Sequence, residues 1–257
     1  MVASAPIFFL AALAGAPASS GDALQKALGF FKSQDFAAAA ATLAPGKGGQ
    51  RCGPPLESYC AYYRGEALFY AGRFEEAAGE FRAARKLEET AAVGPLVNRA
   101  LSREGEAHWR AGAAAQAVEC LREAVKTEPT PERRLSLAEA LIAEARTGFP
   151  AEAVAEWRRL YVEHPEHPTS ELARQRLEDA KALATLRVTD HLSRGERLLA
   201  VGLPGRALPA IHRAMGQART PAEEYRAELA LGRIMSGLRE GERAEAQAGR
   251  MKQPLRV

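Results

Sequence analysis

The chain has 257 residues, of which 47% are hydrophobic and 26% charged, and its formal net charge is +3 at pH 7. These values are ordinary for a soluble globular protein of one large or two small domains. Basic and acidic residues are well mixed, which excludes a nucleic-acid binder with a basic patch. Ala, Leu, Glu and Arg are abundant and runs of Val, Ile and Thr are nearly absent, so the composition favours helices over strands.

The N-terminus has the pattern of an export signal. Residues 1–18 carry no charged side chain and contain the apolar run PIFFLAALAGA, which is about as long as a signal-peptide core and too short to span a bilayer. Ala16 and Ala18 supply small residues at the two positions that a signal peptidase reads. We therefore predict a signal peptide over residues 1–18 and a periplasmic or secreted protein. No basic residue precedes the run, so the alternative is an ordinary buried first helix.

The three cysteines do not have the spacing of zinc ligands. In an exported protein Cys52 and Cys60 are candidates for a disulfide, because they flank the short turn RCGPPLESYC, and Cys120 is then left over. The alternative is three free, partly buried thiols. His164 and His167 in HPEHP stand beside prolines in a turn rather than on one helix face. We predict no metal site and no cofactor.

Three stretches share a fixed pattern of small residues. They are GEALFYAGRFEEAAGEFRAA (65–84), GEAHWRAGAAAQAVECLREA (105–124) and GERLLAVGLPGRALPAIHRA (195–214). In each, a Gly is followed seven residues later by a second Gly, an Ala comes five residues after that, and another Ala seven further. With a helical period, each stretch is two amphipathic helices joined at the second Gly, which suits the left-handed conformation that ends helices. The first Gly and first Ala are then expected on facing helix surfaces, with no room for bulk.

The pattern resembles the tetratricopeptide repeat, with G-x-x-Y in its first helix, A-x-x-x-F in its second and Pro at its end. The resemblance implies an all-α fold, an α-solenoid of TPR-like helical hairpins forming a curved superhelix, with about six degenerate repeats over residues 19–257. A degenerate first copy has Ala27, Phe36, Ala39 and Leu43. The signature positions are Gly65, Gly72, Ala77, Phe81, Ala84, Gly105, Gly112, Ala117, Leu121, Ala124, Pro129, Ala153, Trp157, Pro165, Gly195, Gly202, Ala207, Ile211, Ala214, Gly232 and Ala244.

Motifs of catalysis are absent from the sequence. It has no Walker loop, no G-x-S-x-G and no H-E-x-x-H, so we predict that the chain is not an enzyme.

The order of segments resembles a second, more specific family. The export signal and repeats are followed by AVAEWRRLYVEHPEHPTSELARQRL and a restart at LSRGERLLAVGLPGRALPAI. Over roughly residues 22–252 this resembles the N-terminal superhelical region of bacterial soluble lytic murein transglycosylases. The resemblance implies a separate lysozyme-like domain with one catalytic Glu. In that domain of the family, a motif opens with Glu-Ser and is followed by a Gly-Leu-Met-Gln stretch. The one Glu-Ser here is Glu57-Ser58, no Gly-Leu-Met-Gln occurs, and no catalytic residue is assigned.

Two functions follow as hypotheses. The first is a non-catalytic scaffold of the cell envelope, because a solenoid offers a concave surface, lined by first helices, for a partner protein. The second is the arm of a murein transglycosylase whose catalytic domain is absent, with peptidoglycan as a further partner. Neither involves nucleic acid or a membrane span. Candidate groove residues are Tyr62, Arg64, Arg103, His108 and Arg194.

Overall fold

The computed structural model describes residues 18–44, 52–90 and 96–251, and the side chains of 21–44, 52–88 and 96–239. The chain divides into two compact units, residues 1–146 and 147–257, and each is described by itself. Apart from Ala18, which begins the first helix, the predicted signal peptide lies outside the described residues and stays a prediction. The side chain of Ala244 also lies outside them.

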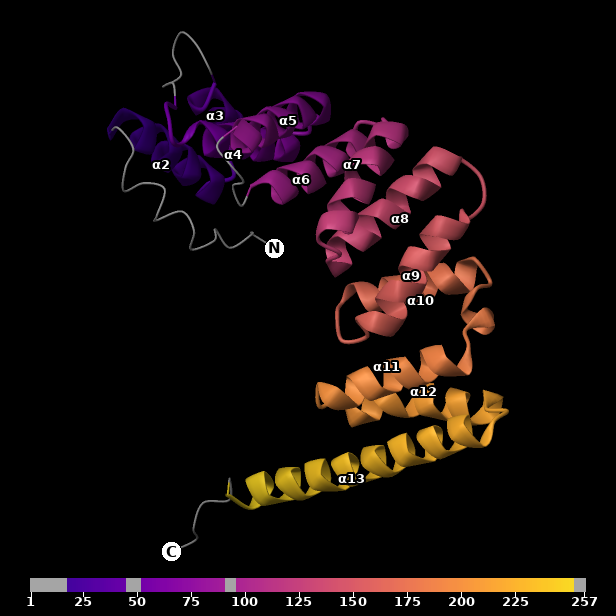
Figure 1. Cartoon of the computed structure of the whole chain (residues 1–257). Helices are drawn as coiled ribbons and strands as arrows, with labels where there is room; N and C mark the ends of the chain where they lie inside the picture. Colours follow the sequence, from indigo (N-terminus) through magenta and orange to yellow (C-terminus); the bar gives the residue numbers. More distant parts are fainter. Residues whose placement is uncertain (1–17, 45–51, 91–95, 252–257) are drawn as a thin grey trace, which may run out of the picture. The chain divides into compact units, whose positions relative to one another are not determined.

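Unit 1 is a run of helices that each pack against the next one in the chain. The helices are α2 (Ala18–Lys32), α3 (Phe36–Thr42), α4 (Glu57–Tyr70), α5 (Phe74–Thr90), α6 (Val97–Arg110), α7 (Ala114–Thr127) and α8 (Pro131–Ala145). Figure 1 shows α4 beside α5 and α6 leading into α7. The described part of the unit contains no strand.

Unit 2 is also built from helices that pack side by side. Its elements are α9 (Ala151–Glu163), α10 (Thr169–Asp179), the short 3₁₀ helix η1 (Leu183–Thr185), α11 (Val188–Ala200), α12 (Pro204–Gln217) and α13 (Pro221–Met251). Helix α9 packs against α10 and α11, and α13 packs against α12 and α11. The prediction of an all-α fold built from consecutive helical hairpins is confirmed over the described residues. None of the described helices is both long enough and apolar enough to cross a membrane.

The first helix of each clear repeat ends at the second Gly of its pattern. Gly72 has a φ of +77°, in the left-handed region that a side chain disfavours. The next residue, Arg73, donates its backbone N–H to the carbonyl of Leu68 at 2.9 Å, which satisfies a carbonyl left free at the helix end. The same turn recurs at Gly112, where Ala113 donates to His108, and at Gly202, where Leu203 donates to Leu198. These turns reverse the chain and create the hairpins.

The first Gly of each pattern lies where two helices of a hairpin meet, a contact line that we call the seam. A Cβ built on Gly65 would stand 2.8 Å from Cε1 of Phe81, and one on Gly105 would stand 2.6 Å from Cγ of Leu121. The pattern therefore pairs this Gly with the large residue of the second helix rather than with the first Ala. In the third copy, Gly195 faces Ile211 in the same way.

The other signature positions fill the core of each unit. Ala77, Ala84, Ala117, Ala124, Ala207 and Ala214 are all fully buried, as are Phe81, Leu121 and Ile211. In unit 2 the core around Ile211 includes Leu192, Leu198 and Ile234. Pro129 is exposed in the link between α7 and α8, whereas Pro165 is buried after α9.

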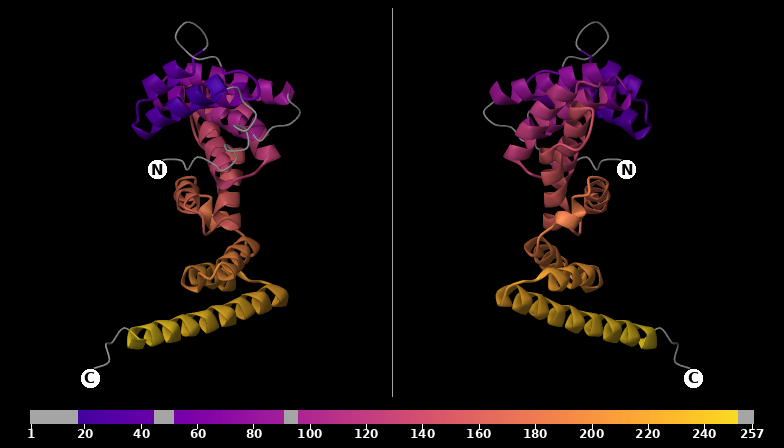
Figure 2. Two further views of the ribbon diagram at one scale, coloured as in Figure 1. Left: turned by 90° about the vertical axis from the view of Figure 1, so that its left-hand side faces the viewer. Right: turned by 90° about the vertical axis from the view of Figure 1, so that its right-hand side faces the viewer.

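The last predicted copy differs from the expectation. Gly232 and Ala244 were expected in a hairpin, but α13 runs through both without a break, as the views of Figure 2 show. A Cβ on Gly232 would meet nothing within 4 Å, so no seam forms there. The copy with Ala153 and Trp157 supplies α9, whose partners in unit 2 are α10 and α11. Both residues are fully buried.

Cys52 and Cys60 are joined by a disulfide at the start of α4, and Cys120 is free and half-buried. The bridge lies beside a small core of Leu24, Leu43 and Leu56 that fixes α2 and α3 on α4.

Candidate interaction surfaces

Two of the predicted groove residues of unit 1 are bound up in the hairpin of α4 and α5. Tyr62 is buried, with 6% of its surface exposed, and its ring packs edge-on against Phe81. Burial is the main cause that raises the pKa of its hydroxyl, and the field of Glu66 raises it further. Arg64 reaches across to Glu80, with 2.5 Å between Nη1 and Oε1. Tyr62 therefore does not line an open groove, because it supports the hairpin.

Arg103, a third groove candidate, is the centre of an ion-pair network between α4 and α6. Its Nε and Nη2 donate to the two oxygens of Glu66 at 2.6 and 2.8 Å, and Nη1 donates to Glu106. The guanidinium also stacks on the ring of Phe69, with 4.1 Å to the centroid. Burial acts against its charge, but Glu66 and Glu106 outweigh it and raise the pKa of Arg103. All three nitrogens of this guanidinium thus donate to the carboxylates of Glu66 and Glu106.

We expect Arg103→Lys to lower the free energy of unfolding by about 1–2 kcal/mol, because an ammonium keeps the charge but loses the bidentate fork and the stacking. Urea titration followed by circular dichroism measures the effect. Arg73→Lys is the matched control, since Arg73 pairs with Glu76 on the open surface, with both side chains more than half exposed. That control is expected to unfold like the parent protein. Equal stability of the two variants would contradict the structural role of Arg103.

His108, on α6, belongs to a cluster with Glu104 of the same helix and Cys120 of α7. One ligand atom from each residue lies within 4.8 Å of the other two. Glu104 is almost fully buried, with 1% exposed. Carboxylate, imidazole and thiol together are a combination that binds zinc in proteins. No sequence motif marks it, because the thiol is contributed by a different helix.

The charges around this cluster favour an ion pair instead of a metal. Arg82 donates from Nε to Glu104 at 2.7 Å, and its Nη2 lies 3.1 Å from Nε2 of His108. Arg85 adds a second positive charge, 3.4 Å from the other carboxylate oxygen. Burial, chiefly, raises the pKa of Cys120 to about 11, so its thiol is protonated at neutral pH and is a poor ligand. The guanidinium of Arg82 already supplies the cation, and we assign no metal to this position.

Glu57 and Ser58, the one Glu-Ser pair, begin α4. The Ser58 hydroxyl is buried and donates to the carboxylate of Glu88 at 2.5 Å, which ties α4 to α5. The pair therefore has a structural contact that explains it.

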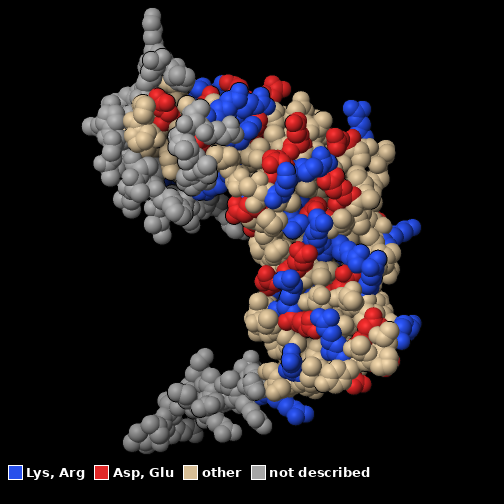
Figure 3. Space-filling model, in the orientation of Figure 1, with Lys and Arg blue, Asp and Glu red and all other residues tan. Residues whose placement is uncertain are grey.

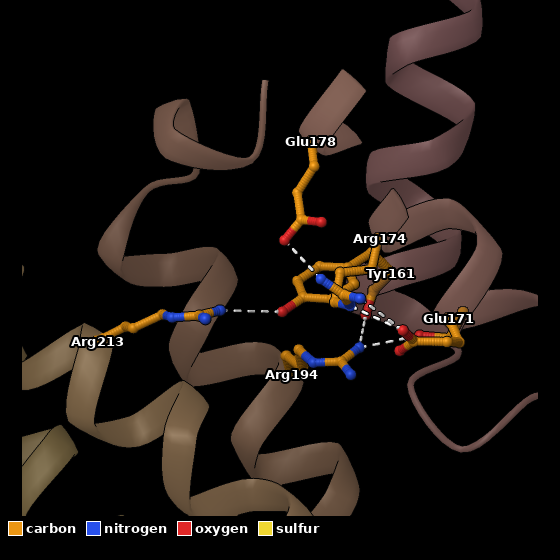
Figure 4. A network of polar contacts seen from close by, with 7 residues as sticks. Tyr161, Glu171, Arg174, Glu178, Arg194 and Arg213 are labelled. Atoms are coloured by element: carbon orange, nitrogen blue, oxygen red, sulfur yellow. Dashed lines mark hydrogen bonds and ion pairs between the residues drawn. The ribbon is translucent and has the colours of Figure 1, made fainter. Parts of the chain in front are cut away.

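Arg194 of α11, the remaining groove candidate, is half-buried against the end of α9. Its guanidinium lies 3.8 Å from the centroid of the Tyr161 ring, and Nη1 donates to the carbonyl of Tyr161 and, at 3.0 Å, to the hydroxyl of Ser170. Figure 4 shows Arg194 on one side of Tyr161 and Arg213 of α12 approaching its hydroxyl. Unlike Arg103, Arg194 hydrogen bonds only to neutral oxygens within the described chain.

Two further arginines, both from α12, complete this surface. Arg213 donates from Nη1 to the Tyr161 hydroxyl at 3.4 Å, and Arg206 donates from Nη2 to the carbonyl of Pro165 at 2.9 Å. Both are exposed. We call Arg194, Arg206 and Arg213 the arginine surface. The two arginines on α12 were not predicted from the sequence, although a signal was present: α12 carries two arginines, a histidine and no acidic residue.

His191 lies one turn before Arg194, and its Nδ1 is buried without a hydrogen-bond partner among the described residues. Burial lowers its pKa, and Arg213 and Arg194 lower it further, against the opposing field of Asp190. Because its pKa is lower in the folded than in the unfolded state, the unfolded state binds the proton more readily. The contribution of His191 to the free energy of unfolding is therefore complete above about pH 6.5 and is lost as the pH falls.

We expect the free energy of unfolding to decrease between pH 7.5 and pH 5.5, with His191 contributing at most about 1.4 kcal/mol per pH unit. His191→Gln removes this part of the pH dependence, while His212→Gln, at an exposed position of α12, leaves it in place. Unit 1 contains Trp109 and unit 2 contains Trp157, so urea titration by fluorescence in a Trp109→Phe background reports on unit 2. An unchanged pH profile for His191→Gln would contradict the assignment.

An open cavity of about 610 Å³ lies between the end of α11, the start of α12 and α13. Leu199, Pro204 and Leu229 give it apolar walls, and the ion pair of Glu196 with Arg226, at 2.5 Å, lies beside them. Its lining is therefore partly apolar and partly charged. On the face that Figure 3 shows, basic and acidic side chains of the described chain are interspersed.

A crystal structure of a tetratricopeptide repeat protein from Parabacteroides merdae ATCC 43184 is similar to this chain, with 14% sequence identity and a TM-score of 0.49. The match covers 93% of this chain and 95% of that one. No protein-family model matches the sequence. No curated protein matches it either.

Proposed function

We propose that this protein is a non-catalytic scaffold that binds a partner protein on the outer faces of its helical hairpins. The seams carry this proposal. At Gly65, Gly105 and Gly195 the two helices of a hairpin lie so close that a side chain would collide with the opposite helix. Such seams hold the outer faces in fixed positions, and a surface that is rigid before binding loses less entropy when a partner binds.

Photo-cross-linking tests the proposal. A photoreactive phenylalanine analogue replaces Tyr70 of α4 or Tyr225 of α13, two residues that are 49% and 68% exposed. Lys126 of α7, with 77% of its side chain exposed, is the control position. We expect one partner protein to be cross-linked from an aromatic position and not from Lys126. That partner, identified by mass spectrometry and purified, should bind the full chain with a measurable Kd by calorimetry.

The scaffold is disproved if none of the positions yields an adduct, or if every purified candidate fails to bind in calorimetry. Binding that persists after urea unfolding of the chain would also disprove it, because a preformed surface would then not be required.

We also propose that the protein works in the cell envelope. The pattern of residues 1–18 supports this location, and so does the Cys52–Cys60 disulfide, because such bonds persist in oxidising compartments. The mass of the native protein in an envelope fraction tests it. A mass slightly below 27.6 kDa, with one free thiol on alkylation, is expected for the processed chain. A cytosolic protein with three free thiols would overturn the proposal.

The second predicted function, an arm of a murein transglycosylase, has no specific support among the described residues, and we do not propose it. A native mass far above 27.6 kDa would bring it back, because the chain would then continue into a further domain.

A further inference from the structure

The arginines of the described chain differ in the groups that they contact. Many are paired with carboxylates: Arg64, Arg73, Arg82, Arg85, Arg103, Arg133, Arg158, Arg159, Arg174 and Arg226. The arginine surface of unit 2 differs, because Arg194, Arg206 and Arg213 donate only to carbonyl and hydroxyl oxygens of the described residues. Neutral oxygens orient a guanidinium without neutralising its charge.

Carboxylates near the arginine surface do not balance it. Glu171 acts on Arg194 and Arg206 through its field, but its hydrogen bonds go to Arg174, at 2.7 and 2.9 Å. Glu178 also pairs with Arg174, as Figure 4 shows. Asp190 pairs with Arg158 at 2.5 Å.

The positive charges of the arginine surface therefore repel one another. Burial is the main cause that lowers the pKa of Arg194, and Arg206 and Arg213 lower it further, against the opposing fields of Tyr161 and Glu171. The buried Nδ1 of His191, on the same helix as Arg194 and without a hydrogen-bond partner in the described chain, is a further group left unsatisfied. An arginine stays charged in proteins, and Glu171 balances these charges only in part, so an anionic ligand would meet an attractive field at this surface.

The spacing indicates what kind of anion fits. Arg206 and Arg213 are seven residues apart on one face of α12, about 10 Å along the helix axis. This span is too wide for one compact ion. It corresponds to about three residues of an extended chain, at about 3.3 Å per residue.

We propose that the arginine surface binds an acidic, extended segment of a partner protein, with side-chain carboxylates on Arg194, Arg206 and Arg213. The inference rests on the proposed scaffold function and names the chemistry of the segment that the scaffold recognises. Arg206 and Arg213 are exposed and available, and each guanidinium keeps N–H groups beyond those used inside the chain.

Fluorescence anisotropy with the full chain tests the site. The probe is a fluorescein-labelled ten-residue peptide in which Glu alternates with Ser, and the comparison peptide has Gln at each Glu. We expect the Glu peptide to bind, the Gln peptide not to bind, and the affinity to fall with added salt. The double variant Arg206→Gln, Arg213→Gln should weaken binding about tenfold or more, the effect of losing roughly one charge-assisted hydrogen bond.

The matched control removes the same charge elsewhere in unit 2. Arg197→Gln with Arg239→Gln changes two exposed arginines outside the arginine surface and should alter the affinity less than about twofold. Equal weakening by both double variants would overturn the site in favour of general charge attraction. Tighter binding of a single-stranded oligonucleotide or of anionic vesicles, lost in the Arg206/Arg213 variant, would overturn the acidic segment.

Failure of this site and failure of the scaffold give different results. If the photo-cross-linked partner still binds the Arg206/Arg213 variant with unchanged Kd, the scaffold stands and the acidic-segment site is disproved. If the Glu peptide binds as expected but no partner protein is found, the site stands and the scaffold is disproved.

Discussion

Replacing Trp157 by Ala is expected to lower the free energy of unfolding of unit 2 by about 3–5 kcal/mol. Trp157 is fully buried in α9 and is the largest such side chain in the described chain. Its removal leaves a cavity that the helices around it fill only in part. One effect reduces the cost: the indole N–H is buried without a hydrogen-bond partner among the described residues, so its loss is favourable. We therefore expect a value near the lower end of the range.

Hydrogen exchange of unit 2 measures this change, since the tryptophan signal is lost with the mutation. Trp157→Phe keeps an aromatic ring, removes the unpaired N–H, and should cost much less than Ala. Phe149→Ala is the control, because Phe149 touches Trp157 edge-on but is 43% exposed, and it should cost about 1 kcal/mol or less. Similar losses for Trp157→Ala and Phe149→Ala would contradict the packing described here.

Replacing Gly105 by Leu should destabilise unit 1 by about 3 kcal/mol, the upper end of the cost of overpacking. Even the first added carbon would stand 2.6 Å from Cγ of Leu121 and 3.2 Å from Cβ of Cys120. The seam between α6 and α7 must therefore open, or Leu121 must leave its rotamer. Urea titration by circular dichroism measures the loss.

Gly79→Leu is the matched control for the seam. Gly79 lies in the middle of α5, is exposed, and has nothing within 4 Å of an added Cβ. Leu favours a helix more than Gly does, so this variant should be as stable as the parent or more stable, by up to about 1 kcal/mol. If Gly105→Leu were as well tolerated as Gly79→Leu, the close approach of α6 and α7 would be disproved.

The sequence alone was sufficient to predict the hairpins, because their determinants are local. A helical period of apolar residues, a Gly with positive φ such as Gly72, and small residues at fixed spacing each act within a few residues of the chain. They are readable without knowing what packs on them. The same reasoning failed at α13, where Gly232 lies in a helix that continues. A Gly within a helix lowers its stability but does not have to end it.

The state of each charged side chain was decided only by the tertiary structure. Arg103 and Arg194 looked alike in sequence, both polar residues on first helices. Arg103 meets Glu66, 37 residues away, and is neutralised. Arg194 meets the backbone carbonyl of Tyr161, 33 residues away, and is not. Ion pairing depends on which helices pack together and at what height, and these distances are set by seams and side-chain volumes across the fold. The sequence by itself therefore determined where most of the helices turn, and the packing of those helices decided which arginines pair with carboxylates.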